Sequence, residues 1–159
     1  MSARSDAGHA DAATGARAAA GAFAAQPVCA SAELAERGRA RLWDVLLWRR
    51  PARAFVLRFD ARVVAYVNRC AHVPAEMDWQ PGEFLDLERR FILCSLHGAS
   101  YEPAGGRCVG GPCAGGRLIS LRVEERDGLV YWYPSPDIVP MPPKQVDAPP
   151  PDGVPAPPP

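Results

Sequence analysis

Cys70-Ala71-His72 and Cys94-Ser95-Leu96-His97-Gly98 are the two segments that decide the interpretation of this chain. Each contains a cysteine followed closely by a histidine, with one residue between them in the first segment and two in the second. Thiolates and imidazoles are the side chains that bind zinc and iron in proteins. The chain contains three histidines, and the third, His9, lies in an alanine-rich leader. The pattern therefore predicts a metal site held between two loops.

The donor set alone leaves the metal open, because zinc sites and iron–sulfur clusters both accept two sulfur and two nitrogen ligands. Zinc fingers with two cysteines and two histidines place both cysteines in one pair and both histidines in the other. Here each pair is mixed, so each loop delivers one thiolate and one imidazole. A two-iron cluster needs this arrangement if the thiolates hold one iron and the imidazoles the other. A structural zinc site remains the alternative.

Short runs of β-branched and aromatic residues surround the two pairs. The segment Asp60-Ala61-Arg62 separates two such runs and predicts a hairpin, as does Arg126-Asp127-Gly128 further along the chain. Many short strands with little helical periodicity are typical of a β-sandwich or a small barrel. We therefore expect an all-β domain with the metal ligands at strand ends. The expected strands cover 27–30, 41–48, 54–59, 63–67, 90–93, 118–123 and 129–132.

Composition changes at both ends of the chain. Residues 1–26 are mostly Ala, Gly, Ser and Asp, and prolines dominate residues 134–159. Neither end has enough large apolar side chains to offset the entropy lost on ordering. We expect a disordered leader over 1–26, one domain over 27–133 and a disordered tail over 134–159.

Charge and hydropathy exclude several classes of partner. The chain has 18 basic and 18 acidic residues, without the basic stripe that indicates a nucleic-acid partner. No apolar run approaches the roughly 18–20 residues needed to cross a bilayer, and the leader lacks the apolar core of a secretory signal. We expect a cytoplasmic protein that contacts neither nucleic acid nor membrane and keeps its thiols reduced.

The two pairs match the C-x-H…C-x-x-H-G pattern of the Rieske [2Fe–2S] family, which this chain resembles. The later Gly110-Gly111-Pro112 resembles the proline-containing loop that shields the cluster in that family. The resemblance covers about residues 27–133. It implies an antiparallel β-sandwich or small barrel, with a cluster-binding subdomain formed by two loops and covered by a third loop that contains Pro112.

The resemblance also implies the metal ligands. One [2Fe–2S] cluster is expected per chain, with two cysteines on a buried iron and two histidines on an outer, solvent-facing iron. The expected ligands of the buried iron are Cys70 and Cys94, and those of the outer iron are His72 and His97.

Neighbouring positions indicate the subtype of Rieske protein. Respiratory members have a disulfide between the cluster loops, but the matching positions here are Ala75 and Leu96. A serine that donates to a bridging sulfide in those proteins is replaced by Ala99, whereas Tyr101 keeps the position of a tyrosine that donates to a cysteine sulfur. Because fewer donors disfavour the more negative reduced cluster, the resemblance implies a ferredoxin-type protein with a potential below that of the respiratory type.

The resemblance implies a bacterial one-electron carrier that links a flavin-dependent reductase to an oxygenase or a similar acceptor. No unassigned set of histidines and carboxylates remains for a mononuclear iron site, so we expect no substrate-transforming site and no catalytic residue in this chain. Two alternatives stay open. The chain could be the small Rieske subunit of a larger oxidoreductase, such as a nitrite reductase or an arsenite oxidase, or a zinc-stabilised or regulatory β module. We expect a monomer.

The remaining cysteines have simpler interpretations. Cys29 is expected in the core of the domain, and Cys108 and Cys113 are expected as free thiols rather than as a disulfide or a second metal site. The loop between the two ligand pairs is expected to be solvated, and a role in partner docking stays open for it. Its exposed candidates are Trp79, Glu76, Asp78, Glu83, Asp86 and Glu88.

Overall fold

The computed structural model describes residues 23–143, so the disorder expected for residues 1–22 and 144–159 lies outside the described range. Within that range the regular secondary structure is β, as the sequence predicts, apart from one short turn of 3-10 helix. The elements are β1 (Gln26–Ala30), η1 (Ser31–Glu33), β2 (Arg41–Leu47), β3 (Arg50–Phe59), β4 (Arg62–Val67), β5 (Ile92–Leu93), β6 (Ser100–Tyr101), β7 (Cys108–Gly110), β8 (Arg122–Arg126), β9 (Leu129–Tyr133) and β10 (Ile138–Pro140). No helix in residues 23–143 is long and apolar enough to cross a membrane.

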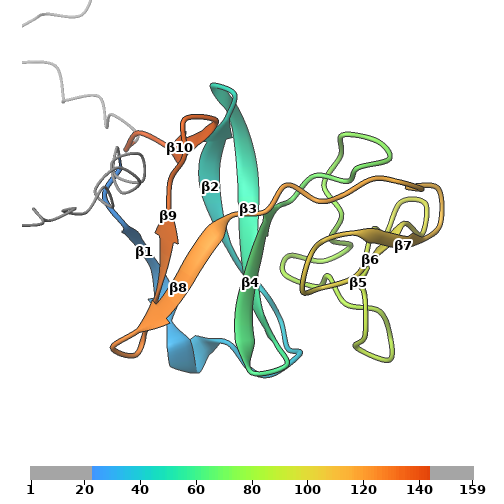
Figure 1. Ribbon diagram of the computed structural model, residues 1–159, viewed down its shortest axis with the longest axis horizontal. Helices are drawn as coiled ribbons and strands as arrows, with labels where there is room; N and C mark the ends of the chain where they lie inside the picture. Colours follow the sequence, from blue (N-terminus) through green and yellow to red (C-terminus); the bar gives the residue numbers. More distant parts are fainter. Residues whose placement is uncertain (1–22, 144–159) are drawn as a thin grey trace, which may run out of the picture.

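The strands form three antiparallel sheets (Figure 1). One sheet has the order β1-β9-β8 and a second has the order β10-β2-β3-β4, and side chains from both form one buried core between them. The third sheet, β5-β6-β7, is small and lies on the other side of the second sheet (Figure 1). The result is a β-sandwich with a separate subdomain attached to one of its sheets.

Tight two-residue turns close three of the hairpins. Both central residues have positive φ in the turns at Trp48-Arg49, at Asp60-Ala61 and at Asp127-Gly128. Turns of this kind match the right-handed twist of the paired strands, and Asp and Gly tolerate the conformation well. The hairpins predicted around Asp60-Ala61-Arg62 and around Arg126-Asp127-Gly128 are therefore confirmed.

Strand β3 is buried on both faces and connects the sandwich to the subdomain. Ala54 and Val56 belong to the core between the two larger sheets. The alternate residues Phe55 and Leu57 belong to a second core, which the subdomain shares. Phe55 stacks on Phe84 of the subdomain, with 3.7 Å between ring centroids. Because side chains alternate across a strand, one apolar run supports both cores and fixes the subdomain against the sandwich.

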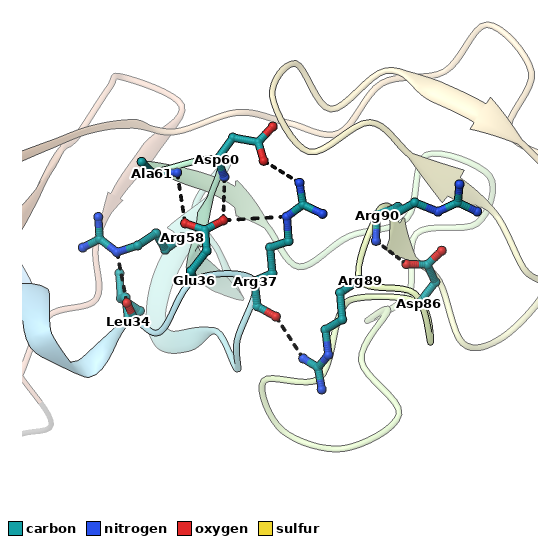
Figure 2. A network of polar contacts seen from close by, with 9 residues as sticks. All are labelled: Leu34, Glu36, Arg37, Arg58, Asp60, Ala61, Asp86, Arg89 and Arg90. Atoms are coloured by element: carbon teal, nitrogen blue, oxygen red, sulfur yellow. Dashed lines mark hydrogen bonds and ion pairs between the residues drawn. The ribbon is translucent and has the colours of Figure 1, made fainter.

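A polar network also attaches the subdomain to the segment before β2 (Figure 2). The Glu36 carboxylate accepts hydrogen bonds from the backbone N–H groups of Asp60 (2.7 Å) and Ala61 (3.0 Å) at the turn between β3 and β4. The carbonyl of Arg37 accepts one from the Arg89 guanidinium at 3.1 Å. These contacts tie the turn, the N-terminal segment and the subdomain together.

The domain extends further than the sequence suggested. Strand β10 pairs with β2, Ile138 opposite Leu47, and Ile138 is buried. The disorder expected from residue 134 is therefore wrong for residues 134–143. The surrounding prolines obscured a short apolar strand, and Pro140 is tolerated because β10 lies at the edge of its sheet.

Candidate metal centre

Two loops carry the four predicted ligands to the end of the subdomain. The first loop follows β4 and contains Cys70 and His72, and the second follows β5 and contains Cys94 and His97. Cys70 and Cys94 are 4% and 1% exposed, whereas both histidines are exposed. The imidazole rings lie 5.2 Å apart, edge to face. The structure therefore pairs the two thiols inside the subdomain and the two imidazoles on its solvent side.

The four donors form two pairs rather than one tetrahedral group. The Cys70 and Cys94 side chains interact with each other, and the two histidine rings are neighbours. Within residues 23–143, no three His, Cys, Asp or Glu side chains converge on a common point suited to one metal ion. A structural zinc site needs four donors around one ion, whereas each iron of a Rieske cluster takes two protein ligands. The donor geometry therefore fits the cluster better than zinc.

Backbone N–H groups stabilise a thiolate at Cys70. Burial raises the pKa of this thiol, but a hydrogen bond from Tyr101 and backbone N–H groups of Val73 and His72 outweigh that effect, so the pKa is lowered. The same donors stabilise negative charge on a sulfur bound to iron. The loop therefore favours the deprotonated sulfur that a metal-binding cysteine needs.

The second loop has a matching arrangement around Cys94. The backbone N–H groups of Leu96 and His97 are directed at its sulfur and lower the pKa of the thiol, but burial and the adjacent Cys70 raise it more. Gly98, at φ +73°, closes this turn by donating its N–H to the Cys94 carbonyl at 3.0 Å. Of the two neighbouring thiols, Cys70 therefore loses its proton more readily than Cys94.

Tyr101 connects the two ligand loops. It lies on β6, directly after the second loop, and is fully buried. Its hydroxyl accepts a hydrogen bond from the Ala71 N–H (3.0 Å) and lies 3.1 Å from the Cys70 sulfur. Either atom of this contact can be the donor when Cys70 is a thiol, but a Cys70 thiolate can only accept, so the Tyr101 hydroxyl then donates to it. Burial and this contact raise the pKa of Tyr101 above its ordinary value, so the phenol remains a donor.

Replacing Tyr101 with Phe should lower the reduction potential by about 50 mV, or about 1 kcal/mol for one electron, because the sulfur loses a donor that stabilises the reduced cluster. Protein-film voltammetry measures this shift. Tyr66→Phe is the matched control, since Tyr66 is also buried but donates its hydroxyl to the Pro103 carbonyl at 2.6 Å. Equal potentials for the two variants would contradict the role of Tyr101.

The third loop, which contains Pro112, packs against both ligand loops. A Cβ atom on Gly111, at φ +76°, would lie 2.5 Å from the Gly98 carbonyl oxygen. A Cβ on Gly116 would lie 3.0 Å from the Ala71 side chain. Pro112, the proline of this loop, is exposed. The loop therefore lies directly on the ligand loops, and the glycines allow the close approach.

Cys108 and Cys113 form a disulfide, with 5.7 Å between their Cα atoms. The prediction of two free thiols is therefore wrong. It relied on an expected reducing compartment, whereas the Gly110-Gly111-Pro112 turn brings the two cysteines into bonding range. Cys29 is a free thiol in the sandwich core, as predicted.

The structure also shows what surrounds the positions that distinguish Rieske subtypes. Ala75 is half-buried and Leu96 is exposed, so no cross-link joins the ligand loops at these positions. Ala99 is fully buried beside the second loop, and the hydroxyl of the neighbouring Ser100 is bonded to the Gly98 carbonyl at 3.3 Å. The second loop therefore places a methyl group where respiratory members place a hydroxyl.

Residues 24–132 match the Rieske [2Fe-2S] domain. The chain belongs to this family. Its cofactor is accordingly a Rieske-type [2Fe–2S] cluster, and two buried thiols with two exposed imidazoles fit that group. A search of curated proteins finds no significant match to the sequence.

Solved structures with the same fold include the ferredoxin of carbazole 1,9a-dioxygenase from Nocardioides aromaticivorans IC177. It is 20% identical, with a TM-score of 0.55, and the match covers 70% of this chain and 98% of the ferredoxin. The reduced complex between oxygenase and ferredoxin in carbazole 1,9a-dioxygenase matches at 22% identity and a TM-score of 0.54 over 69% of this chain. The terminal oxygenase from Novosphingobium sp. KA1 matches at 25% identity, with a TM-score of 0.54, over 78% of this chain. The match covers only 28% and 34%, respectively, of the chains in these two structures.

Proposed function

We propose that this protein is a one-electron carrier of the ferredoxin type, which receives electrons from a flavin-dependent reductase and passes them to an oxygenase or a similar acceptor. In this proposal Cys70 and Cys94 hold the inner iron, and His72 and His97 hold the outer iron. When bound, the cluster supplies one-electron redox chemistry. The observation that carries the proposal is the exposure of both imidazoles at one end of the domain while the thiols are buried.

The protein residues around the histidines suit a docking partner. Val73 and Leu96, each next to a histidine in sequence, are 39% and 53% exposed, and Val109 on β7 is 45% exposed. Exposed apolar side chains around a functional group are typical of an interaction site, because a partner removes them from water. A docked partner would therefore lie directly over the two imidazoles.

Charge on this end of the molecule favours an acidic partner. The acidic residues of the loop between the ligand pairs are largely engaged within the protein: Glu83 lies 3.5 Å from Arg39 and 3.7 Å from Arg89. Among the described residues, Arg69 and Arg117 have no carboxylate within ion-pair distance. Both line a cavity of about 350 Å³ that also contains Cys70. Arg117 is exposed and Arg69 is half-buried, and unpaired basic groups beside the cluster attract acidic surfaces.

Arg69→Glu should slow oxidation of the reduced protein by ferricyanide, an anionic probe, by about threefold to tenfold at low ionic strength, because the local potential changes sign. Oxidation by the cationic hexaamminecobalt(III) should become faster. Stopped-flow absorbance measures both rates. Arg62→Glu is the control, since Arg62 lies at the other end of β4. Equal rate changes in the two variants would show that net charge, not this surface, determines the effect.

Electron paramagnetic resonance of the anaerobically purified, dithionite-reduced protein tests the function itself. A Rieske centre gives a spectrum with an average g value below that of the free electron, whereas a zinc protein gives no signal. Iron and acid-labile sulfide should be present in equal amounts. Zinc without sulfide would reject the electron-carrier proposal in favour of a zinc-stabilised module. Stable copurification with a large redox chain would favour the subunit alternative.

A further inference from the structure

The Cys108–Cys113 disulfide lies outside the set of predicted cluster ligands. It joins β7 to the third loop and encloses Val109-Gly110-Gly111-Pro112. It does not connect the two ligand loops, and the ligand cysteines Cys70 and Cys94 are separate from it. Its effect on the metal centre must therefore act through the third loop.

The segment closed by this disulfide meets the ligand loops at two points. Cys108 pairs with Tyr101 between β6 and β7, and Tyr101 contacts the Cys70 sulfur. Within the disulfide-closed segment, Gly111 packs on the Gly98 carbonyl with no room for a side chain. If this segment moved, it would no longer pack in the same way on the second ligand loop. The strand pairing that positions Tyr101 would change as well.

We propose that Cys108–Cys113 is a second redox site, which a dithiol protein of the thioredoxin class reduces and which controls how closely the third loop covers the ligand loops. Cys108 is half-buried beside the exposed Val109, whereas Cys113 is 3% exposed. Cys108 is therefore the more accessible half of the disulfide. This proposal does not depend on which proteins exchange electrons with the cluster.

The reaction is a thiol–disulfide exchange. A thiolate of the dithiol attacks the Cys108 sulfur, the bond to Cys113 breaks, and the Cys113 sulfur leaves as a thiolate and takes up a proton. The second thiol of the reductant then attacks the mixed disulfide, releasing Cys108 as a thiolate that is protonated in turn. Two electrons and two protons are transferred in total, and the reductant becomes a disulfide.

Reduction should loosen the loop, because removal of a cross-link restores conformational freedom to the segment it closed. The disulfide form, by contrast, should hold the loop against Gly98 and shield the cluster. The dithiol form should expose the ligand loops to water and to small molecules. We therefore expect the cluster to become more accessible under reducing conditions.

The test uses the anaerobic, full-length protein with its cluster. Thioredoxin with a catalytic amount of its reductase and NADPH is added, followed by iodoacetamide, and peptides are mapped by mass spectrometry. We expect alkylation at Cys108 and Cys113 only after reduction. Cluster loss to the chelator EDTA, followed by visible absorbance, should become faster by on the order of fivefold in the reduced protein.

The double variant C108S/C113S should lose its cluster at the fast rate with or without thioredoxin. Cys29→Ser is the matched control, because Cys29 is buried in the sandwich core and should leave the response to thioredoxin unchanged. A disulfide that resists thioredoxin, or reduction that leaves the rate of cluster loss unchanged, would overturn the proposal. Both outcomes can be read in the wild-type protein, so they do not depend on whether the variants fold.

Discussion

Replacing His97 with Cys should lower the reduction potential by on the order of 100 mV, because a thiolate ligand adds negative charge to the cluster and disfavours the reduced state. His97 is exposed at the end of the second ligand loop, so the substitution does not disturb the core of the domain. The change should also move the visible absorption and raise the average g value of the reduced cluster. Voltammetry and electron paramagnetic resonance on the same preparation measure these effects.

The control for an added thiol is Ser120→Cys. Ser120 is exposed and lies outside the three loops of the metal centre, at a bridge to Tyr66. This variant should keep the potential and the spectra of the wild type. If His97→Cys also kept them, His97 would not be a ligand of the outer iron, and the assignment based on the sequence pattern would be wrong.

The metal centre was the part of the molecule most accessible from sequence. The cysteine and the histidine of each pair are separated by only one or two residues, so each half of the site is encoded locally. Cys70 and Cys94 are brought together by the fold, but their family pattern was specific enough to predict the pairing. The two hairpins with Asp at the turn were predictable for the same reason, because their turn chemistry is local.

Two features depended on contacts that are distant in sequence or on conditions outside it. Strand β10 is stabilised by pairing with β2, so Ile138 gains a partner in Leu47 that local composition does not reveal. The disulfide between Cys108 and Cys113 was missed because an expected compartment was given more weight than the intervening glycine-rich turn. In the first case the proline-rich composition, and in the second the expected compartment, was given more weight than a specific contact.

The role of β3 could be predicted only in part. Four consecutive apolar residues at 54–57 predicted a strand, and a continuous apolar run is consistent with burial on both faces. The sequence could not show what covers each face. The structure places the sandwich core on one side and the metal-centre subdomain on the other. This explains why a short subdomain with one small sheet can hold its loops in a fixed arrangement.

Cys94→Ser should abolish cluster binding. Cys94 is 1% exposed, and its sulfur receives two backbone N–H groups and lies beside Cys70. A serine hydroxyl stays protonated near neutral pH and is a poor ligand for iron, so the inner iron loses one of its two protein ligands. Iron and sulfide in the purified protein should fall by about tenfold or more, as measured by elemental analysis and colorimetric sulfide assay.

The same variant should be less stable than the wild type, because the cluster binds only the folded loops and cross-links them. Losing a tightly bound cofactor lowers the free energy of unfolding by about 3 kcal/mol or more, which chemical denaturation under anaerobic conditions measures. Cys29→Ser removes a thiol that is also buried, 8% exposed, but in the sandwich core, so it should lose some stability and keep full iron and sulfide. If both variants lost stability and kept their iron, Cys94 would be a core residue. Because the two substitutions are chemically identical, their difference isolates the contribution of the metal centre from that of packing.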